Sequence, residues 1–264
     1  MKLKQSEAIL LSVQDLQEAD RVVEFLTRDE GKRRGVARGA KRRYSRFAGE
    51  LQPLAKVRVG WVEKEGRDLV RISSVELLRP SKALASDLEG ILLGAAIAEL
   101  MSVVAQENEP SEVAFRLLDS TIEALEAGID RALVARYYES WVLRLAGIFP
   151  TPVDCPQCGR TFEEAGAALA ASGEAILCRD DAGRGPGALR ISPAAIDFWR
   201  RIGRENLPKM ATAPPSASVL DEVEEVAGRI RRHFLQHELK SLTVMERTLG
   251  TLGGVEERRR GEPR

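Results

Sequence analysis

The residue pattern of this chain changes its period at Pro80, and that change limits the folds open to it. Before Pro80, short runs rich in alternating or β-branched residues are separated by turn signals that contain Gly, Asp and Pro. After it, apolar residues recur with the spacing of amphipathic helices. Strands and helices are therefore segregated along the chain, and we expect an α+β protein with more than one domain.

The strand-rich part predicts a small barrel. Alternation is clearest at 57–61, which reads Val-Arg-Val-Gly-Trp. About five or six short strands in 80 residues suit a closed or partly open β-barrel, and the OB-fold is the commonest barrel of this size that binds single strands. The expected strands are 8–13, 21–27, 32–37, 55–62, 69–74 and 75–78.

The helical part shows start signals at polar residues whose side chains cap a first turn, and glycine stop signals at Gly128 and Gly147. The long helix expected near the end of this part runs to about Lys240. The expected N-terminal residues are Ser81, Ser111, Asp130, Ser192 and either Ser216 or Ser218. The sequence thus predicts an OB-fold domain at 1–80 and a mostly helical domain at 81–249 with a zinc-finger-like insertion at 153–187. A disordered tail, rich in Gly, Glu and Arg, is predicted at 250–264.

Charge is distributed unevenly between these parts. The chain has 40 Lys and Arg and 40 Asp and Glu, a net charge of zero. Residues 1–80 carry 18 basic and 12 acidic residues, so the other 184 residues carry 22 and 28. A chain with such an imbalance can present a phosphate-binding surface at one end and still have no net charge.

The basic residues concentrate between Gly31 and Gly49, a stretch without an acid that also contains Tyr44 and Phe47. Guanidinium groups bind phosphate oxygens in a bidentate manner and aromatic faces stack on unpaired bases, so the stretch predicts a polynucleotide site. A solvated charged loop is the alternative. If either aromatic residue anchors the loop to the barrel, we expect it to be Phe47. The basic residues are Lys32, Arg33, Arg34, Arg38, Lys41, Arg42, Arg43 and Arg46.

The three cysteines have the spacing of a structural metal site. Cys155 and Cys158 enclose two residues, and after a gap of 19 residues Cys178 is followed three positions later by Asp181. Thiolates in two such pairs are typical of structural zinc, and a carboxylate can supply the fourth ligand. Asp180 is an alternative fourth ligand, and a knuckle that folds without metal is also open. A disulfide framework is not expected, because three cysteines cannot all pair within one chain.

Other features argue against a membrane protein or an enzyme. The apolar stretch at 91–100 is too short and too polar to span a bilayer, and no secretory signal precedes it, so we expect a cytoplasmic protein. His233 and His237 would share a face of the last helix, but the basic residues around them favour a surface role over metal binding. No P-loop or dinucleotide motif is present, and we expect no catalytic residues.

Three segments in the first 50 residues carry a family resemblance. They are 18–32 (Glu-Ala-Asp-Arg-Val-Val-Glu-Phe-Leu-Thr-Arg-Asp-Glu-Gly-Lys), 36–41 (Val-Ala-Arg-Gly-Ala-Lys) and 45–49 (Ser-Arg-Phe-Ala-Gly). Together they resemble the N-terminal domain of the bacterial recombination mediators of the RecO family. Leu-Gln-Pro at 51–53, the cysteine knuckle and the stretch at 233–241 follow in the same order, so the resemblance spans 5–242.

The resemblance implies an OB-fold, then a helical domain with a zinc-finger-like insertion, in a DNA repair and recombination mediator of the nucleoid. Such a protein binds single- and double-stranded DNA, anneals strands, and works with RecR and RecF to exchange single-strand-binding protein for RecA on gapped DNA. Asp181 stands where zinc-binding members of the family have a fourth cysteine, so the resemblance does not decide whether this chain binds zinc. The DNA contacts implied by motif position, with Lys32 and Tyr44 added from the basic stretch, are Lys32, Arg33, Arg34, Arg38, Lys41, Arg42, Arg43, Tyr44 and Arg46.

The net acidic helical part is the expected place for protein contacts. We expect a groove among its helices to take the C-terminal tail of single-strand-binding protein, with Arg231, Arg232 or Lys240 pairing the acidic residues of that tail. An OB-fold protein that binds RNA in translation or RNA processing is the main alternative function. A hydrolase that uses the knuckle metal is the second.

Overall fold

The computed structural model of the chain describes residues 2–64, 66, 68–150, 152–162, 166–182 and 187–249. Contacts divide the chain into two compact units. The first unit takes in the residues up to Glu126 and those from Leu239 onward, and the second is Ala127–Glu238. The tail predicted at 250–264 lies outside the described residues, as do parts of the predicted insertion, at 163–165 and 183–186.

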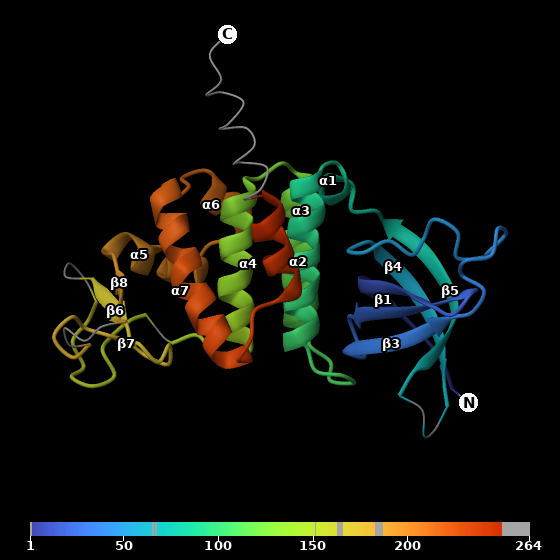
Figure 1. The fold of residues 1–264 in the computed structure, drawn as a ribbon, viewed down its shortest axis with the longest axis horizontal. Helices are drawn as coiled ribbons and strands as arrows, with labels where there is room; N and C mark the ends of the chain where they lie inside the picture. Colours follow the sequence, from blue (N-terminus) through green and yellow to red (C-terminus); the bar gives the residue numbers. More distant parts are fainter. Residues whose placement is uncertain are drawn as a thin grey trace, which may run out of the picture. The chain divides into compact units, whose positions relative to one another are not determined.

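The first unit begins with a closed five-stranded barrel, coloured blue to cyan in Figure 1. Its strands are hydrogen-bonded in the order β1-β2-β3-β5-β4, and β4 pairs back onto β1. β3 and β5 pair in parallel and the other neighbours pair antiparallel, which is the OB-fold arrangement that the sequence predicts. The bounds are β1 (Lys2–Leu16), β2 (Asp20–Thr27), β3 (Lys32–Ala37), β4 (Lys56–Glu63) and β5 (Val70–Arg79). The two strands expected at 69–74 and 75–78 are therefore one.

Alternation along the strands fills the barrel with apolar side chains. Phe25 of β2 and Trp61 of β4 are fully buried there, and their rings meet edge to face with centroids 5.8 Å apart. Burying aromatic side chains of this size contributes about 1.5–3 kcal/mol each. Phe47, from the connection between β3 and β4, joins the same core and is 2% exposed. The structure therefore confirms that Phe47 anchors the basic stretch to the barrel.

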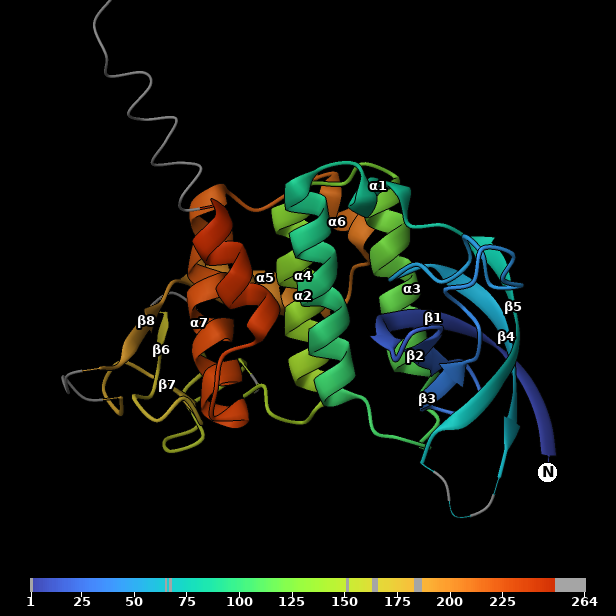
Figure 2. The same ribbon diagram turned by 45° about the vertical axis from the view of Figure 1, so that its right-hand side comes forward.

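Helices of the first unit pack against the barrel, and both α2 and α3 contact β1 (Figures 1 and 2). The helix expected to start at Ser81 is two helices, because the Ser81 hydroxyl donates to the carbonyl of Pro53 and does not cap a turn. The Asp87 carboxylate accepts from the Gly90 amide at 2.8 Å and starts α2. The bounds are α1 (Lys82–Ala85), α2 (Leu88–Val104) and α3 (Glu112–Glu126).

The second unit combines helices with a small sheet of order β7-β6-β8. Asp130 and Ser192 cap α4 and α5 by accepting from the amides of Leu133 and Ala195, as the sequence predicts. α7 contacts α4, α5 and β8. The bounds are α4 (Arg131–Leu145), β6 (Ala167–Leu169), β7 (Ile176–Leu177), β8 (Leu189–Ile191), α5 (Pro193–Ile202), α6 (Leu207–Ala211) and α7 (Ala217–Leu235).

The last helix of this unit is shorter than expected. α7 ends at Leu235, and Gln236 adopts a left-handed conformation with φ of 60°. His237 therefore lies beyond the helix, and the prediction that it shares a helical face with His233 is wrong. Residues 240–249 form a further helix, whose first amides, those of Lys240 and Ser241, donate to the Glu99 carboxylate of α2. This contact joins the end of the described chain to the first unit.

The compact units differ from the predicted domains, which divide strands from helices at residue 80. α1–α3 belong with the barrel because polar contacts and packing join them to its strands. Among the residues that the structure describes, no helix has the length and apolar character needed to cross a bilayer.

Candidate functional site

The basic stretch leaves β3 and returns to β4 as a chain of tight turns with fixed ends. The Asp20 carboxylate accepts from the Gly39 amide at 2.8 Å, and the Ala19 carbonyl accepts from the Lys41 amide at 3.0 Å. Further turn hydrogen bonds link 42–45, 45–48 and 47–50. With Phe47 buried in the barrel, the backbone holds its outward side chains in a defined arrangement.

Most of the charged side chains in this stretch face solvent. Tyr44 is 88% exposed, and the guanidinium carbon of Arg43 lies 5.5 Å from the centre of its ring. Within the described part of the chain, the exposed arginines have no acidic partner. We call this set the basic surface; it consists of Arg34, Arg38, Lys41, Arg42, Arg43, Tyr44 and Arg46. It offers guanidinium groups to phosphates and one aromatic face to a base.

Two of the predicted contact residues are committed elsewhere. Lys32 Nζ donates to the carbonyl of Ser102 at 2.6 Å and lies 3.6 Å from Glu24. Arg33 pairs with Glu30 and Glu63 at 2.9 and 3.2 Å, and its side chain is 13% exposed. The structure therefore does not bring Lys32 and Arg33 onto the basic surface, because acids of other strands and turns neutralise them.

Lys41 belongs to the basic surface but has an acidic neighbour. Its ammonium group lies 2.8 Å from Asp15, and this contact, helped by Arg21, holds the pKa of the Asp15 carboxyl below its usual range. Asp15 therefore compensates part of the charge of Lys41, whereas the arginines of this surface have no acidic neighbour among the described residues. The charge of Lys41 is accordingly less available to an anion than that of the arginines.

One basic residue near this surface lies far from the stretch in sequence. Arg71 of β5 is exposed, and the parallel pairing of β3 with β5 places it opposite Val36. Arg34 lies two residues from Val36 on β3, so Arg71 extends the positive charge across the strand pair. The alternation of residues in β5 predicts that Arg71 faces outward. That it lies beside β3 and its Arg34 follows only from the pairing of β3 with β5.

The three cysteines and Asp181 come together as the spacing predicts. One ligand atom from each lies within 4.8 Å of all the others. Asp181 Oδ2 lies 3.1 Å from Cys155 Sγ and 3.2 Å from Cys178 Sγ, and the Sγ atoms of Cys158 and Cys178 are 3.7 Å apart. Zn–S bonds of about 2.3 Å in a tetrahedron separate two sulfurs by about 3.8 Å, so the donor set fits zinc.

The Asp181 carboxylate controls the protonation of the thiols in this cluster. Hydrogen bonds from the three thiols lower the pKa of Asp181 to about 2, and the same carboxylate raises the pKa of Cys158 to about 12. The Cys158 thiol therefore carries its proton at neutral pH when no metal is bound, and metal binding would release protons. Asp180, the alternative ligand, instead forms an ion pair with Arg160.

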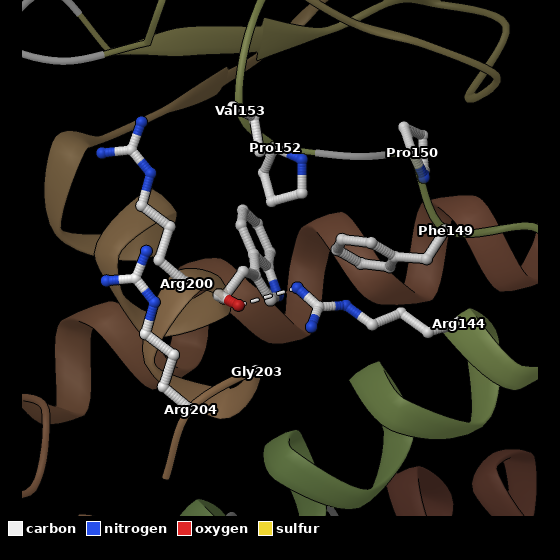
Figure 3. Close-up of a pocket in the computed structure, with 9 residues that line it drawn as sticks. Arg144, Phe149, Pro150, Pro152, Val153, Arg200, Gly203 and Arg204 are labelled. Atoms are coloured by element: carbon white, nitrogen blue, oxygen red, sulfur yellow. Dashed lines mark hydrogen bonds between the residues drawn. The ribbon is translucent and has the colours of Figure 1, made fainter.

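A separate pocket in the second unit is lined by arginine and apolar side chains. Its volume is about 430 Å³, and Phe149, Pro152 and Val153 form its walls. Figure 3 shows Arg200 and Arg204 pointing the same way from α5 and the turn after it, while Arg144 enters from the end of α4. We call this cavity the arginine pocket; its lining is Arg144, Phe149, Pro150, Pro152, Val153, Trp199, Arg200, Gly203 and Arg204.

Arg144 is the most enclosed cation of the arginine pocket. Its guanidinium donates to the carbonyl of Trp199 at 2.7 Å, and its central carbon lies 5.6 Å from the ring centres of both Trp141 and Phe149. Burial lowers the pKa of this guanidinium, and within the described residues no carboxylate pairs with it. An anion in the pocket would supply the missing counter-charge.

The residues predicted to meet a protein partner have other surroundings. Arg231 is 6% exposed and pairs with Glu139 and, at 3.0 Å, with Glu238, so it is not open to a partner. Arg232 is half exposed and also pairs with Glu238. Lys240 is exposed at the start of the helix at 240–249. The contact sites expected at Arg232 and Lys240 stay predictions.

Comparison with known proteins places both parts of the chain. Residues 1–81 match the family described as Recombination protein O N terminal, and residues 85–243 match Recombination protein O C terminal. The DNA repair protein RecO of Koribacter versatilis (strain Ellin345) is 30% identical over 93% of this chain and 99% of its own length. That of Anaeromyxobacter sp. (strain Fw109-5) is 32% identical over 96% and 97%. That of Desulforudis audaxviator (strain MP104C) is 30% identical over 94% and 98%.

Proposed function

Because the chain belongs to the RecO family of DNA repair and recombination proteins, we propose that it acts as a recombination mediator that binds single- and double-stranded DNA. In this proposal it promotes annealing of complementary strands. It also helps RecR and RecF to exchange single-strand-binding protein for RecA on gapped DNA. The observation that carries the proposal is the row of exposed arginines without acidic partners around Tyr44.

The basic surface supports DNA binding without strong sequence preference. Its arginines neutralise phosphates and release condensed counterions, which gives affinity that falls as salt rises. Annealing is opposed by repulsion between two polyanions, and a cationic surface lowers that repulsion. Tyr44 stacks on an unpaired base, which favours single strands. No bond is made or broken in this mechanism, and we assign no catalytic residue.

Zinc is the metal that suits the cysteine cluster, and we propose a structural role for it. Cys155, Cys158, Cys178 and Asp181 would hold the ion and leave no position for a substrate. When bound, the metal supplies a cross-link between two chain segments. The chain's own contribution is to bring the four ligands together through the turn at 155–159 and the strand pair β6–β7.

We place the contact with single-strand-binding protein at the arginine pocket and not at Arg231. The acidic residues of that protein's tail would pair with Arg200 and Arg204, and an apolar side chain of the tail would enter between Phe149 and Val153. Arg144 would then gain a counter-charge. No surface is assigned to RecR, RecF or RecA.

DNA binding is tested by reversing charge on the basic surface. The variant R38E/R42E/R43E changes three exposed arginines without acidic partners, and K82E/R116E/K209E makes the same change of net charge at exposed residues elsewhere. At about 50 mM salt we expect the first variant to bind single strands much more weakly and to lose annealing, and the salt slope of its remaining binding should be lower by about 2. The control should behave as wild type, and equal losses in both variants would contradict a localised site.

Competition separates DNA from RNA, the alternative substrate. DNA and RNA oligonucleotides of identical sequence compete for the labelled protein, and we expect DNA to bind at least as tightly as RNA. Preference for RNA by an order of magnitude or more would favour the RNA-binding alternative.

A separate titration with the tail peptide of single-strand-binding protein tests the arginine pocket. R200E/R204E should abolish its binding, while R232E should not.

A further inference from the structure

The three thiols of the cysteine cluster differ in their exposure to solvent. Cys155 and Cys178 are 1% and 4% exposed, whereas Cys158 is exposed. Cys158 lies in the tight turn in which the Gly159 amide donates to the Cys155 carbonyl at 2.8 Å. A small reactant from solvent therefore meets the sulfur of Cys158 before it meets the other two.

Cys158 also has a second sulfur within reach. Its Sγ lies 3.7 Å from that of Cys178. The Asp181 carboxylate lies at similar distances from Cys155 and Cys178, 3.1 and 3.2 Å. A disulfide needs sulfurs about 2.05 Å apart, so the turn that carries Cys158 has to move by less than about 2 Å along this line. A surface turn absorbs such a movement more readily than the buried segment around Cys178.

We propose that Cys158 and Cys178 form a reversible disulfide when the protein meets a peroxide, and that zinc leaves the cluster as they do. This regulation rests on the metal site proposed above for its second part. Without metal the same two sulfurs can still join, but more slowly, because the Asp181 carboxylate raises the pKa of Cys158. Asp181, which stands in the fourth ligand position, cannot be oxidised and cannot hold the ion together with Cys155 alone.

The chemistry balances with hydrogen peroxide as the oxidant. With zinc bound, Cys158 is held as a thiolate. Its sulfur attacks one peroxide oxygen, the O–O bond breaks, and the products are a sulfenic acid and hydroxide. The Cys178 thiolate then attacks the Cys158 sulfur, an S–S bond forms and a second hydroxide leaves. Two thiolates, one peroxide and two protons give one disulfide and two waters. A dithiol such as dithiothreitol reverses the change.

Oxidation would reach the arginine pocket through the hairpin at 153–162. The Val153 carbonyl accepts from the Phe162 amide at 3.1 Å and Val153 lines the pocket, while the Phe162 carbonyl accepts from Arg200 at 3.2 Å. The Cys155 amide donates to the Arg160 carbonyl within the same hairpin. Movement of the turn at 155–159 therefore disturbs one wall of the pocket and the partner of one of its arginines.

The test uses the full chain, reconstituted with zinc, and peroxide in slight excess. Released zinc is followed with a chromogenic chelator, and peptide mapping identifies which cysteines are joined. We expect a peptide pair linked through Cys158 and Cys178 that has lost two hydrogen atoms, with zinc released at the same rate. Dithiothreitol together with zinc should restore the starting state.

Matched single variants decide which sulfur reacts. C158S and C155S each remove one thiol, and only C155S keeps the proposed pair, so thiol loss should be at least about tenfold slower in C158S. Both are also measured without metal, which removes any effect of weaker zinc binding. A link between Cys155 and Cys158, or sulfinic acids without a disulfide, would overturn the inference. Failure of the wild type to take up zinc would refute the metal site, while the mapping would still decide on the disulfide.

Discussion

Tyr44 and Phe47 lie three residues apart in one loop, yet their surroundings give them opposite roles. Phe47 is 2% exposed and packs in the barrel core, whereas 88% of Tyr44 is exposed. The Arg43 guanidinium beside the Tyr44 ring adds positive charge where a base and its phosphate would lie. The sequence alone gives two candidate aromatic residues, and burial separates the anchor from the stacking residue.

Replacing Tyr44 by Ala should weaken single-strand binding and leave the fold unchanged. Loss of one stacked base costs about 1–3 kcal/mol of binding free energy. Y44F keeps the ring and should bind as wild type. Fluorescence anisotropy with a labelled single strand gives the affinities, and thermal unfolding checks the fold. F47A should lose about 3–5 kcal/mol of stability; an equal effect of Y44A on unfolding would contradict the exposed position of Tyr44.

Gly31 is the glycine whose replacement should cost most. Its φ is +73°, and a Cβ there would lie 2.3 Å from the backbone oxygen of Glu109. Its carbonyl also accepts from the amide and hydroxyl of Thr27. We expect G31A to lower the free energy of unfolding by more than about 2 kcal/mol, because the left-handed conformation alone costs about 1–2 kcal/mol.

Gly49 is the matched control for this prediction. Its φ is +79°, but nothing lies within 4 Å of the position that a Cβ would take, so G49A meets only the conformational cost. Urea unfolding of both variants should therefore place G49A between wild type and G31A. Equal midpoints for the two variants would show that the close approach of Glu109 does not matter.

At the scale of elements, α4 and α7 are joined by buried charges. Arg231 of α7 pairs with Glu139 of α4, and both side chains are less than a tenth exposed. Arg136 lies 3.5 Å from Glu139 and 3.1 Å from Glu224. Burial raises the pKa of Glu139, and the nearby guanidinium of Arg231 opposes that shift. Glu139 therefore depends on Arg231 to remain charged inside the unit.

R231L should destabilise the protein by about 3–5 kcal/mol, because it leaves the Glu139 carboxylate buried without its main partner. The double variant E139L/R231L should recover most of this loss. In R231L the folded-state pKa of Glu139 lies further above its unfolded value, so the folded state binds the proton more tightly. Stability then falls as pH rises through that window. Urea unfolding should show a smaller defect at about pH 5 than at about pH 8; a pH-independent defect would contradict it.

Local signals in the sequence predicted these elements well, and long-range contacts account for the differences. Asp130 and Ser192 cap their helices because a cap needs only residues three positions apart. Ser81 does not cap a helix, because its hydroxyl donates to the carbonyl of Pro53, 28 residues away in sequence. α7 ends early because Gln236 adopts a left-handed conformation, which is unusual for glutamine.

The same distinction holds for the candidate sites. The cysteine spacing predicted the cluster of three thiols and Asp181, because the knuckle is local and one strand pair brings in Cys178. The basic stretch predicted the exposed arginines but not the pairing of Arg33, since its partner Glu63 lies on β4. The arginine pocket had no sequence signal, because its arginines come from α4, from the end of α5 and from the turn after it.

At the scale of the whole molecule, the barrel depends on helices that follow it in sequence. Lys56 of β4 pairs with Asp119 of α3 at 2.7 Å and lies 5.7 Å from the Phe115 ring centre. A second contact joins α2 to β2, because the Ser102 hydroxyl of α2 donates to the Glu24 carboxylate of β2 at 2.7 Å. These interactions join α2 and α3 to strands of the barrel. Contacts therefore continue across residue 80, where the strands end and the helices begin.

A fragment that ends at residue 81 should therefore fail to form a stable barrel, whereas a fragment that ends at residue 126 should fold. Cutting at 81 removes Asp119, the nearer acidic partner of Lys56, and both acidic partners of Arg79, and it exposes the face of β1 that α2 and α3 cover. Loss of a partner in a part-buried ion pair and exposure of apolar surface both lower stability, and small domains have only a small free energy of unfolding.

Dispersion of amide signals by NMR and urea unfolding compare the two fragments. We expect the longer fragment to unfold cooperatively at a lower urea concentration than the full chain, because it lacks the contact of Glu99 with residues 240 and 241. A well-dispersed spectrum from the shorter fragment would show that the strands alone contain enough burial to fold.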